Sequence, residues 1–259
     1  MITLHAQQLT MAIGTYTGTG SKGIYTYSFD LQTGKALLLH TLAMDNPSYV
    51  CFSASGKTLY AVNENDDSTA AVTAVRIEPT TSAMSLLDRL QTHGTAPCYV
   101  ERSGRTLLTA NYSGGTMSVF TIAGDGSLGK LALQVPGIAC GPDTARQCVP
   151  HVHTTRFTPD GHYILATDFS ADAVMRIPLT LPANGQPEVK RYTVAAGSGP
   201  RHIEFSPDGS MVYVMSELSD AVTVFRYNDG NLERVQEVKA GDGAHGGADI
   251  HITPDGRFL

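Results

Sequence analysis

A short phrase that recurs at a nearly fixed interval is the feature of this sequence that most constrains its fold. Thr158-Pro159-Asp160-Gly161, Ser206-Pro207-Asp208-Gly209 and Thr253-Pro254-Asp255-Gly256 are full copies, and Ser53–Gly56 and Glu101–Gly104 are weaker ones. Apart from one longer interval before the Thr158 copy, the closing glycines recur every ~48 residues, which indicates a supersecondary unit copied several times. Pro-Asp-Gly is itself a turn, because proline presets φ, aspartate hydrogen-bonds the backbone ahead and glycine adopts positive φ.

The residues around each turn predict what kind of unit is repeated. Short apolar or alternating runs rich in β-branched residues precede and follow the turn, and such runs are typical of strands. No amphipathic pattern with helical period and caps is present, so we expect an all-β protein. Four short antiparallel strands in a unit of this length make a β-propeller blade. In one unit the four runs are residues 49–52, 58–62, 71–75 and 86–90.

The repeats also predict how many blades the chain holds. The first unit begins at its second strand, so we expect it to lack the innermost strand. Arg257-Phe258-Leu259 begins a strand that nothing completes, which favours a longer ring cut short over a five-bladed ring closed by residues 248–255. We expect about five blades, at approximately 10–45, 46–93, 96–147, 150–198 and 200–246, with the next blade starting over 248–259.

Composition restricts the partners of the protein. The 259 residues carry a net charge of −6 and contain no run of lysine or arginine, which argues against nucleic acid or an anionic membrane surface as partner. No apolar stretch approaches the length of a membrane span. The segment 1–7 resembles the end of a signal peptide but is too short to be a whole one. We expect a cytoplasmic location, with the periplasm as the alternative if that segment is a signal-peptide remnant.

The four cysteines fall into two pairs. Cys51 and Cys98 lie within strand runs, where they serve as small buried apolar residues. Cys140 and Cys148 bracket seven residues in the longest repeat. They could close a small disulfide loop if the protein is exported. The spacing of this pair does not suit a metal site.

Polar residues collect at the end of each hairpin opposite the turn, where the innermost strand begins and the second strand ends. Innermost strands of neighbouring blades converge on the central channel, so these side chains should share one opening. Equivalent places hold different residues, which suggests a site, although such residues also tie blades together by hydrogen bonds. The candidates are His153, Arg201, His202, Asp249 and His251 on the innermost strands, and Asn111, Asp168 and Glu217 at the ends of the second strands.

The histidines raise the question of a metal. His151, His153, His202 and His251 are near enough in the repeat to bind one in principle. Their offsets from the turn differ between blades, and no acidic partner is evidently paired with each of them. We therefore expect no metal and no other cofactor.

Several strings carry a specific family resemblance. Gly199–Gly209, Ala248–Arg257, Ala110–Gly115 and His151-Val152-His153 closely resemble the lactonase family of seven-bladed propellers, and the resemblance extends along the whole chain. That family contains the propeller-type 6-phosphogluconolactonase and the eukaryotic carboxy-cis,cis-muconate cyclase. The resemblance implies seven blades in the full protein, with about five present here, and a further site arginine in a blade beyond Leu259.

By motif, the catalytic groups proposed for the cyclase branch of that family look like His153, Arg201 and Glu217. Lactone opening needs an activated water and a cation for the developing oxyanion, which histidine and arginine can supply, while Glu217 would orient the histidine or act as acid. We expect His202, Asp249, His251, Asn111 and Asp168 to bind substrate.

No Gly-x-Ser-x-Gly elbow is present, which favours direct attack by water. The expected activity is hydrolysis of a small anionic sugar lactone, foremost 6-phosphogluconolactone. The alternatives are a muconate-type lactonising cyclase and a non-enzymatic interaction module.

Overall fold

The computed structural model describes residues 8–183, 185–241 and 246–259; the segment that resembles a signal-peptide end, residues 1–7, lies outside them. This described part is built from strands, turns and loops and contains no helix, as predicted. Accordingly, no helix in it is long and apolar enough to cross a membrane.

The strands form five antiparallel sheets, and in each sheet neighbours along the chain are hydrogen-bonded. Among the described residues the first sheet has three strands, β1 (Gln8–Ile13), β2 (Gly23–Asp30) and β3 (Ala36–Ala43), and no innermost strand, as predicted. The second and third sheets contain β4 (Val50–Phe52), β5 (Thr58–Asn63), β6 (Ala71–Ile77) and β7 (Met84–Gln91), then β8 (Pro97–Ser103), β9 (Thr106–Asn111), β10 (Thr116–Ile122) and β11 (Leu128–Pro136). The fourth and fifth contain β12 (Val152–Phe157), β13 (Tyr163–Asp168), β14 (Ala173–Pro178) and β15 (Lys190–Thr193), then β16 (Pro200–Phe205), β17 (Met211–Ser216), β18 (Ala221–Asn228) and β19 (Asn231–Lys239).

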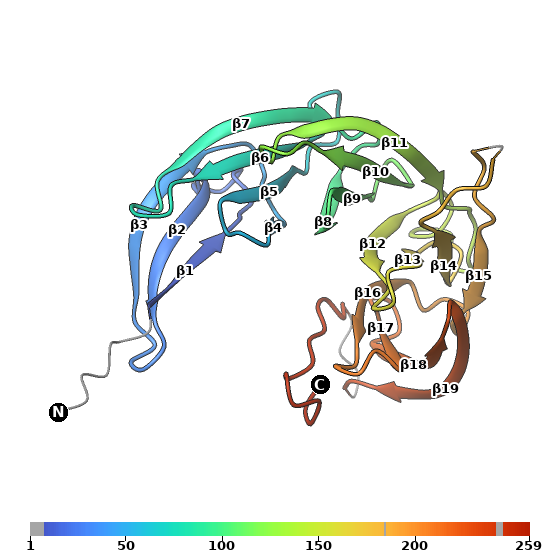
Figure 1. Cartoon of the computed structure of the whole chain (residues 1–259). Helices are drawn as coiled ribbons and strands as arrows, with labels where there is room; N and C mark the ends of the chain where they lie inside the picture. Colours follow the sequence, from blue (N-terminus) through green and yellow to red (C-terminus); the bar gives the residue numbers. More distant parts are fainter. Residues whose placement is uncertain (1–7, 184, 242–245) are drawn as a thin grey trace.

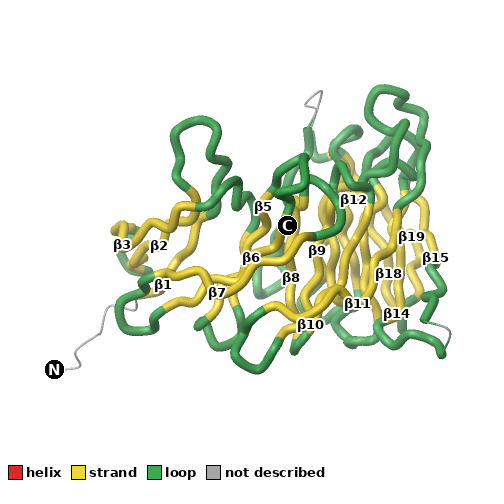
Figure 2. Tube along the Cα trace, turned by 90° about the horizontal axis from the view of Figure 1, so that it is seen from above, coloured by secondary structure: helices red, strands yellow, loops and turns green. Residues whose placement is uncertain are grey.

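The sheets follow one another along an open arc, with β4, β8, β12 and β16 on its inner side (Figure 1). These first strands contact each other from sheet to sheet, β4 with β8, β8 with β12 and β12 with β16. Figure 2 shows the same sheets from above, with loops gathered at the two ends of the strands. This radial arrangement of four-stranded sheets is that of a β-propeller.

The innermost strand expected from Ala248 onward is not formed. Residues 248–252 adopt no strand, although the next turn is present, with Gly256 N donating to Thr253 O at 2.8 Å and Thr253 N to Phe258 O at 2.8 Å. A strand is defined by its ladder, and among the described residues no partner strand lies beside this segment. The five-bladed closure through residues 248–255 is likewise not adopted, since the first sheet keeps three strands.

The hydrophobic core lies between successive sheets. Residues alternate between its two sides, so that Leu59 and Ala61 of β5 pack toward the first sheet while Tyr60 and Val62 pack toward the third. All four side chains are essentially inaccessible to solvent. Strands buried on both faces read as continuous apolar runs, which explains the sequence pattern around each turn.

The repeated turns have the predicted conformation. Gly161, Gly209 and Gly256 have φ of 73°, 72° and 70°. In the first of these turns, Asp160 Oδ1 accepts hydrogen bonds from Thr158 Oγ1 at 2.6 Å and from His162 N at 3.0 Å. The aspartates of the repeat therefore serve the turn, and they lie at the end of the hairpin away from the predicted site.

The cysteine pairs differ as expected in their surroundings. Cys98 is buried in β8, and Cys51 is partly buried in β4. Cys140 and Cys148 are exposed, and in this structure both are free thiols.

Candidate functional site

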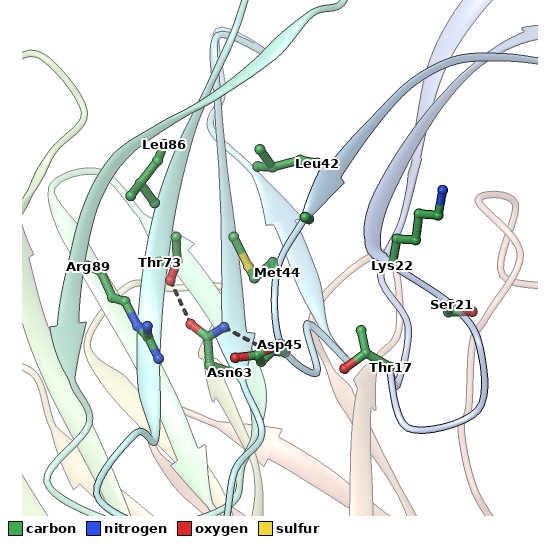
Figure 3. A pocket seen from close by; sticks show the side chains of 11 residues that line it. Thr17, Ser21, Lys22, Leu42, Met44, Asp45, Asn63, Thr73, Leu86 and Arg89 are labelled. Atoms are coloured by element: carbon green, nitrogen blue, oxygen red, sulfur yellow. Dashed lines mark hydrogen bonds between the residues drawn. The ribbon is translucent and has the colours of Figure 1, made fainter.

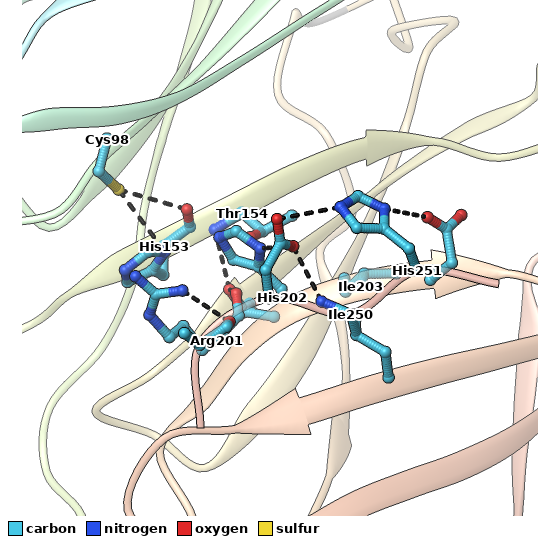
Figure 4. Close-up of polar contacts among 12 residues, drawn as sticks. Cys98, His153, Thr154, Arg201, His202, Ile203, Ile250 and His251 are labelled. Carbon is cyan, nitrogen blue, oxygen red and sulfur yellow. Dashed lines mark hydrogen bonds and ion pairs between the residues drawn. The ribbon is translucent and has the colours of Figure 1, made fainter. Parts of the chain in front are cut away.

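His153 lies at the centre of the predicted constellation, in β12, with only 7% of its surface exposed. Its Nδ1 is 3.7 Å from Cys98 Sγ, and its ring centroid is 5.2 Å from that of His202 (Figure 4). Burial holds the pKa of His153 well below its ordinary value, and the nearby positive charge of Arg201 acts in the same direction. His153 is therefore a neutral imidazole at neutral pH, able to accept a proton.

Arg201 and Glu217 form an ion pair beside this histidine. Arg201 is the second residue of β16 and Glu217 immediately follows β17, so the antiparallel pairing brings them together. Arg201 Nε is 3.3 Å from Glu217 Oε2, and Arg201 Nη1 donates to Ala248 O at 2.6 Å. A break in the ladder register between Pro200 and His202 falls at Arg201. The structure thus brings the three predicted catalytic residues to one end of the inner strands.

Arg146 also reaches this cluster, although the sequence analysis did not single it out. Its Nη2 donates to Glu217 Oε1 at 2.6 Å and to Tyr112 Oη at 3.1 Å, and its guanidinium lies 5.3 Å from the ring centroid of Phe169. Arg146 belongs to the loop between β11 and β12, which accounts for the longer interval between turns. That extra length was the available signal that this loop carries a function.

Glu64 adds a second carboxyl to the same end of the molecule. It occupies the place in its repeat that Glu217 occupies in the fifth sheet, eight residues after the turn glycine. Tyr16 Oη donates to Glu64 Oε2 at 2.7 Å, and Ser48 Oγ donates to the same oxygen. Burial raises the pKa of Glu64, while the hydrogen bonds and the charge of Arg201 oppose that shift.

His202, Asp249 and His251 form a linked chain. His202 Nδ1 lies 2.5 Å from Asp249 Oδ1, and His251 Nε2 lies 3.0 Å from Asp249 Oδ2 (Figure 4). The hydrogen bond from His202 lowers the pKa of Asp249, so its carboxylate is ionised and accepts the proton of His202 Nδ1. Burial lowers the pKa of His202 in spite of this partner.

His251 is the most exposed residue of this chain of three, and the expectation that it binds substrate stays a prediction. Its side chain is 72% exposed, and its Nδ1 lies 3.4 Å from Glu204 Oε2 of β16. The residue therefore ties the segment after β19 to the fifth sheet. Within the described ranges its polar contacts are with Asp249 and Glu204, and none is with Arg201 or Glu217.

Asn111 and Asp168, which the sequence predicts to bind substrate, are engaged in internal hydrogen bonds, and their role in binding stays a prediction. Both side chains are fully buried. Asn111 Nδ2 donates to Ser118 Oγ at 3.0 Å, and Asp168 Oδ2 accepts from Ile138 N at 2.8 Å. Asn111 bonds within its own sheet, whereas Asp168 binds the loop that precedes its sheet, because the strand's alternation turns both side chains inward.

The equivalent residue of the second sheet shows the same role. Asn63 Oδ1 accepts from Thr73 Oγ1 at 2.6 Å, and Asn63 Nδ2 donates to Asp45 O at 2.7 Å (Figure 3). These bonds lie in an open pocket of about 620 Å³ between the first and second sheets, whose charged lining residues are Lys22, Asp45 and Arg89. None of the predicted site residues lines this pocket, so its size does not make it the candidate active site.

One group of possible metal ligands exists among the described residues. Asp160, His162 and Asp229 lie within reach of one another, and all three are exposed. Asp160 already accepts hydrogen bonds from Thr158 and Tyr227, so its carboxylate is engaged in the turn. This group stands at the turn end of the hairpins, apart from His153 and Glu217.

The fold and the cluster at one end of its inner strands define a β-propeller with a polar site of arginine, glutamate and histidine. The family described as lactonase, seven-bladed β-propeller, matches residues 10–259. The chain therefore belongs to the lactonase family of seven-bladed β-propellers.

One curated relative and two solved structures that are similar to this chain support the same family. A 6-phosphogluconolactonase of Bacillus subtilis (strain 168) is 35% identical over 261 residues, covering 95% of this chain and 72% of the relative. The crystal structure of a candidate 6-phosphogluconolactonase from Bacteroides uniformis is 48% identical, with a TM-score of 0.92, covering 96% of this chain and 74% of that one. The periplasmic gluconolactonase PpgL of Pseudomonas aeruginosa is 31% identical, with a TM-score of 0.88, covering 97% and 74%.

Proposed function

We propose that this protein hydrolyses 6-phosphogluconolactone to 6-phosphogluconate at the site around His153, Arg201 and Glu217. The observation that carries the proposal is a neutral, buried histidine next to an arginine that is paired with a carboxylate. The names of the Bacillus subtilis and Bacteroides uniformis relatives support the substrate class. The substrate is a small anionic lactone, and an arginine-bearing site suits its charge.

The reaction needs a base, a cation and a proton return. His153 accepts a proton from water as the water oxygen bonds to the lactone carbonyl carbon. The guanidinium of Arg201 stabilises the negative charge that develops on the carbonyl oxygen. When the bond from that carbon to the ring oxygen breaks, the protonated His153 returns the proton to the ring oxygen. Water is thereby split between the new carboxylic acid, which ionises at neutral pH, and the freed hydroxyl.

Glu217 serves this scheme through its position. It is held between Arg201 and Arg146, so it fixes the direction of the Arg201 guanidinium. Its carboxylate also keeps the two arginines from repelling one another at close range. We therefore assign Glu217 as a positioning residue that acts through Arg201.

We propose the cytoplasm as the place of this reaction. A phosphorylated sugar lactone is charged and does not cross membranes freely, so an enzyme that uses it is expected where the sugar phosphate is made. The Pseudomonas aeruginosa neighbour is a periplasmic gluconolactonase, so the periplasm is the alternative to test. Cell fractionation with an antibody to the protein gives the answer directly.

Replacement of His153 by alanine tests the proposed function. We expect His153→Ala to lower kcat by about 10²–10⁴-fold, the usual range for loss of a general base. The assay follows formation of 6-phosphogluconate above the uncatalysed rate, with Arg201→Lys and Glu217→Gln in parallel. Arg201→Lys keeps the charge but loses the planar fork, so it should lower activity less than alanine would.

The pH profile gives a second readout of His153. Because its pKa lies well below the ordinary value of about 6.5, kcat/KM should stay level as pH falls through 6.5 and decline only at lower pH. Thermal unfolding of each variant serves as the folding control. Wild-type protein that opens no lactone, or unchanged turnover in a folded His153→Ala variant, would overturn the proposal and leave a binding module as the alternative.

A further inference from the structure

We propose that Arg146 forms a subsite for the anionic substituent of the substrate, the phosphate, and so determines specificity for phosphorylated over unphosphorylated lactones. The inference rests on the proposed function and extends it. It assigns Arg201 to the reacting carbonyl and Arg146 to the charged group at the far side of the sugar ring.

The first support is where Arg146 lies. Its contacts are with Tyr112, Phe169 and Glu217, which each stand eight residues after the turn glycine in three successive repeats. One side chain from a loop thus spans the same position of the third, fourth and fifth sheets. Tyr112, which Arg146 contacts, in turn lies against His153, with 5.5 Å between their ring centroids.

The second support is the unused half of the guanidinium. Both polar contacts of the Arg146 side chain go through Nη2, and within the described ranges Nε and Nη1 have no hydrogen-bond partner. The side chain is 43% exposed, against 24% for Arg201, whose Nε and Nη1 are both engaged. A planar fork with free donors on an exposed side is the geometry that binds a phosphate through two parallel hydrogen bonds.

The local charge favours an anion at this place. Glu217 is shared by two arginines, so it offsets the charge of Arg146 only in part, while the second carboxyl, that of Glu64, interacts with the charge of Arg201. The chain as a whole has a net charge of −6, which makes this positive point a local feature. An anionic ligand is drawn to such a point by electrostatic attraction.

The third support is that the loop backbone is fixed while the guanidinium is not buried. The neighbouring Gln147 is fully buried, and its Nε2 donates to Phe169 O at 2.9 Å and to Asp172 Oδ1 at 2.8 Å. Asp143 accepts hydrogen bonds from the backbone of Arg146. The arginine therefore projects from an anchored base, which reduces the entropy lost when it binds a ligand.

The experiment compares 6-phosphogluconolactone with unphosphorylated glucono-δ-lactone in wild type, Arg146→Ala and Arg146→Lys. We expect Arg146→Ala to lower kcat/KM for the phosphorylated lactone about 10–100-fold more than for the unphosphorylated one, mainly through KM. Arg146→Lys should restore part of this difference, since it keeps charge but not the fork. Arg226→Ala, which removes an exposed arginine paired with Glu233 at 2.6 Å, is the matched control.

The outcomes separate this inference from the proposed function. An equal loss for both lactones would show that Arg146 only positions Glu217 and would overturn the subsite, as would no loss for either. If the wild type opens neither lactone, the proposed function fails, and calorimetric binding of 6-phosphogluconate then decides the subsite. Weaker binding in Arg146→Ala but not in Arg226→Ala supports it, and equal binding in all three proteins overturns it.

Discussion

Burial shifts the pKa values of two side chains in this protein in opposite directions. It lowers the pKa of His153, which stays neutral and able to accept a proton. It raises the pKa of Asp168 to about 6, although that carboxylate accepts hydrogen bonds from Ile138 N and Ala171 N. Both follow from one cause, because a low-dielectric surrounding disfavours whichever form is charged. At neutral pH the histidine is uncharged and has no desolvation cost, whereas the ionised aspartate has one.

The raised pKa of Asp168 predicts a pH dependence of stability. A carboxyl group with a higher pKa in the folded state stabilises the fold when protonated, below about pH 4, and loses that contribution as pH rises through 6. Relative to Asp168→Asn, the unfolding free energy of the wild type should therefore fall by about 2 kcal/mol between pH 4 and pH 7. Urea unfolding at a series of pH values measures this difference. A difference that stays constant over that range would contradict the raised pKa.

At the scale of the element, one hairpin serves two purposes at its two ends. The turn end repeats a glycine at positive φ in every copy, and in the three full copies an aspartate that accepts a hydrogen bond within the turn. The opposite end varies, holding Glu64, Tyr112, Phe169 and Glu217 at one equivalent position. Backbone geometry fixes the first end, while the other is free to carry chemistry.

Two turn glycines allow conformational strain to be separated from crowding. Gly161 and Gly209 have nearly the same φ, 73° and 72°. A Cβ at Gly161 would meet nothing within 4 Å, whereas a Cβ at Gly209 would lie 2.9 Å from Pro159 Cβ. Gly161→Ala should cost about 1–2 kcal/mol for the left-handed backbone alone, and Gly209→Ala about 1–3 kcal/mol more for the close contact. Chemical denaturation measures both, with Gly124→Ala, which is open and has no positive φ, as control. Equal costs at the two turns would show that the Pro159 contact relaxes freely.

At the scale of the whole molecule, charged side chains link the inner strands of successive sheets. Arg156 of β12 lies 3.1 Å from Glu101 of β8 and 3.3 Å from Glu204 of β16. It also donates to Ile203 O at 2.8 Å. All three charged side chains are about a fifth exposed, between 15% and 25%. The arginine therefore holds three sheets together at the inside of the arc, next to the apolar layers between them.

Removal of Arg156 should weaken the joining of these sheets. Arg156→Ala leaves the mostly buried carboxylates of Glu101 and Glu204 without their shared cation, and we expect a loss of about 2–3 kcal/mol in unfolding free energy. Arg226→Ala breaks an exposed pair with Glu233 and should change stability by less than about 1 kcal/mol. Thermal and urea unfolding test the pair of variants together. A similar small effect from both would mean that the apolar layers alone join the sheets.

The tertiary structure shows contacts of several side chains that the sequence pattern did not indicate. Asn111 and Asp168 were placed correctly at the ends of their strands, yet they point into their own sheets and bind neighbouring backbone and hydroxyl groups. Arg146 was missed because its partners Tyr112 and Glu217 are far away in sequence. Contacts of this kind depend on how the sheets are placed around the arc, which no local pattern encodes.

What the sequence determined by itself is everything that rests on local backbone preference. The turns with positive φ, the runs that became strands, the absence of helix in the described residues and the incomplete first sheet all follow from the repeat, because proline, glycine and alternating β-branched residues act over a few positions. Only the tertiary structure decided that residues 248–252 form no strand, since a ladder needs a second strand beside it. It alone also decided which polar groups meet at the site, because burial and charge there come from several sheets at once.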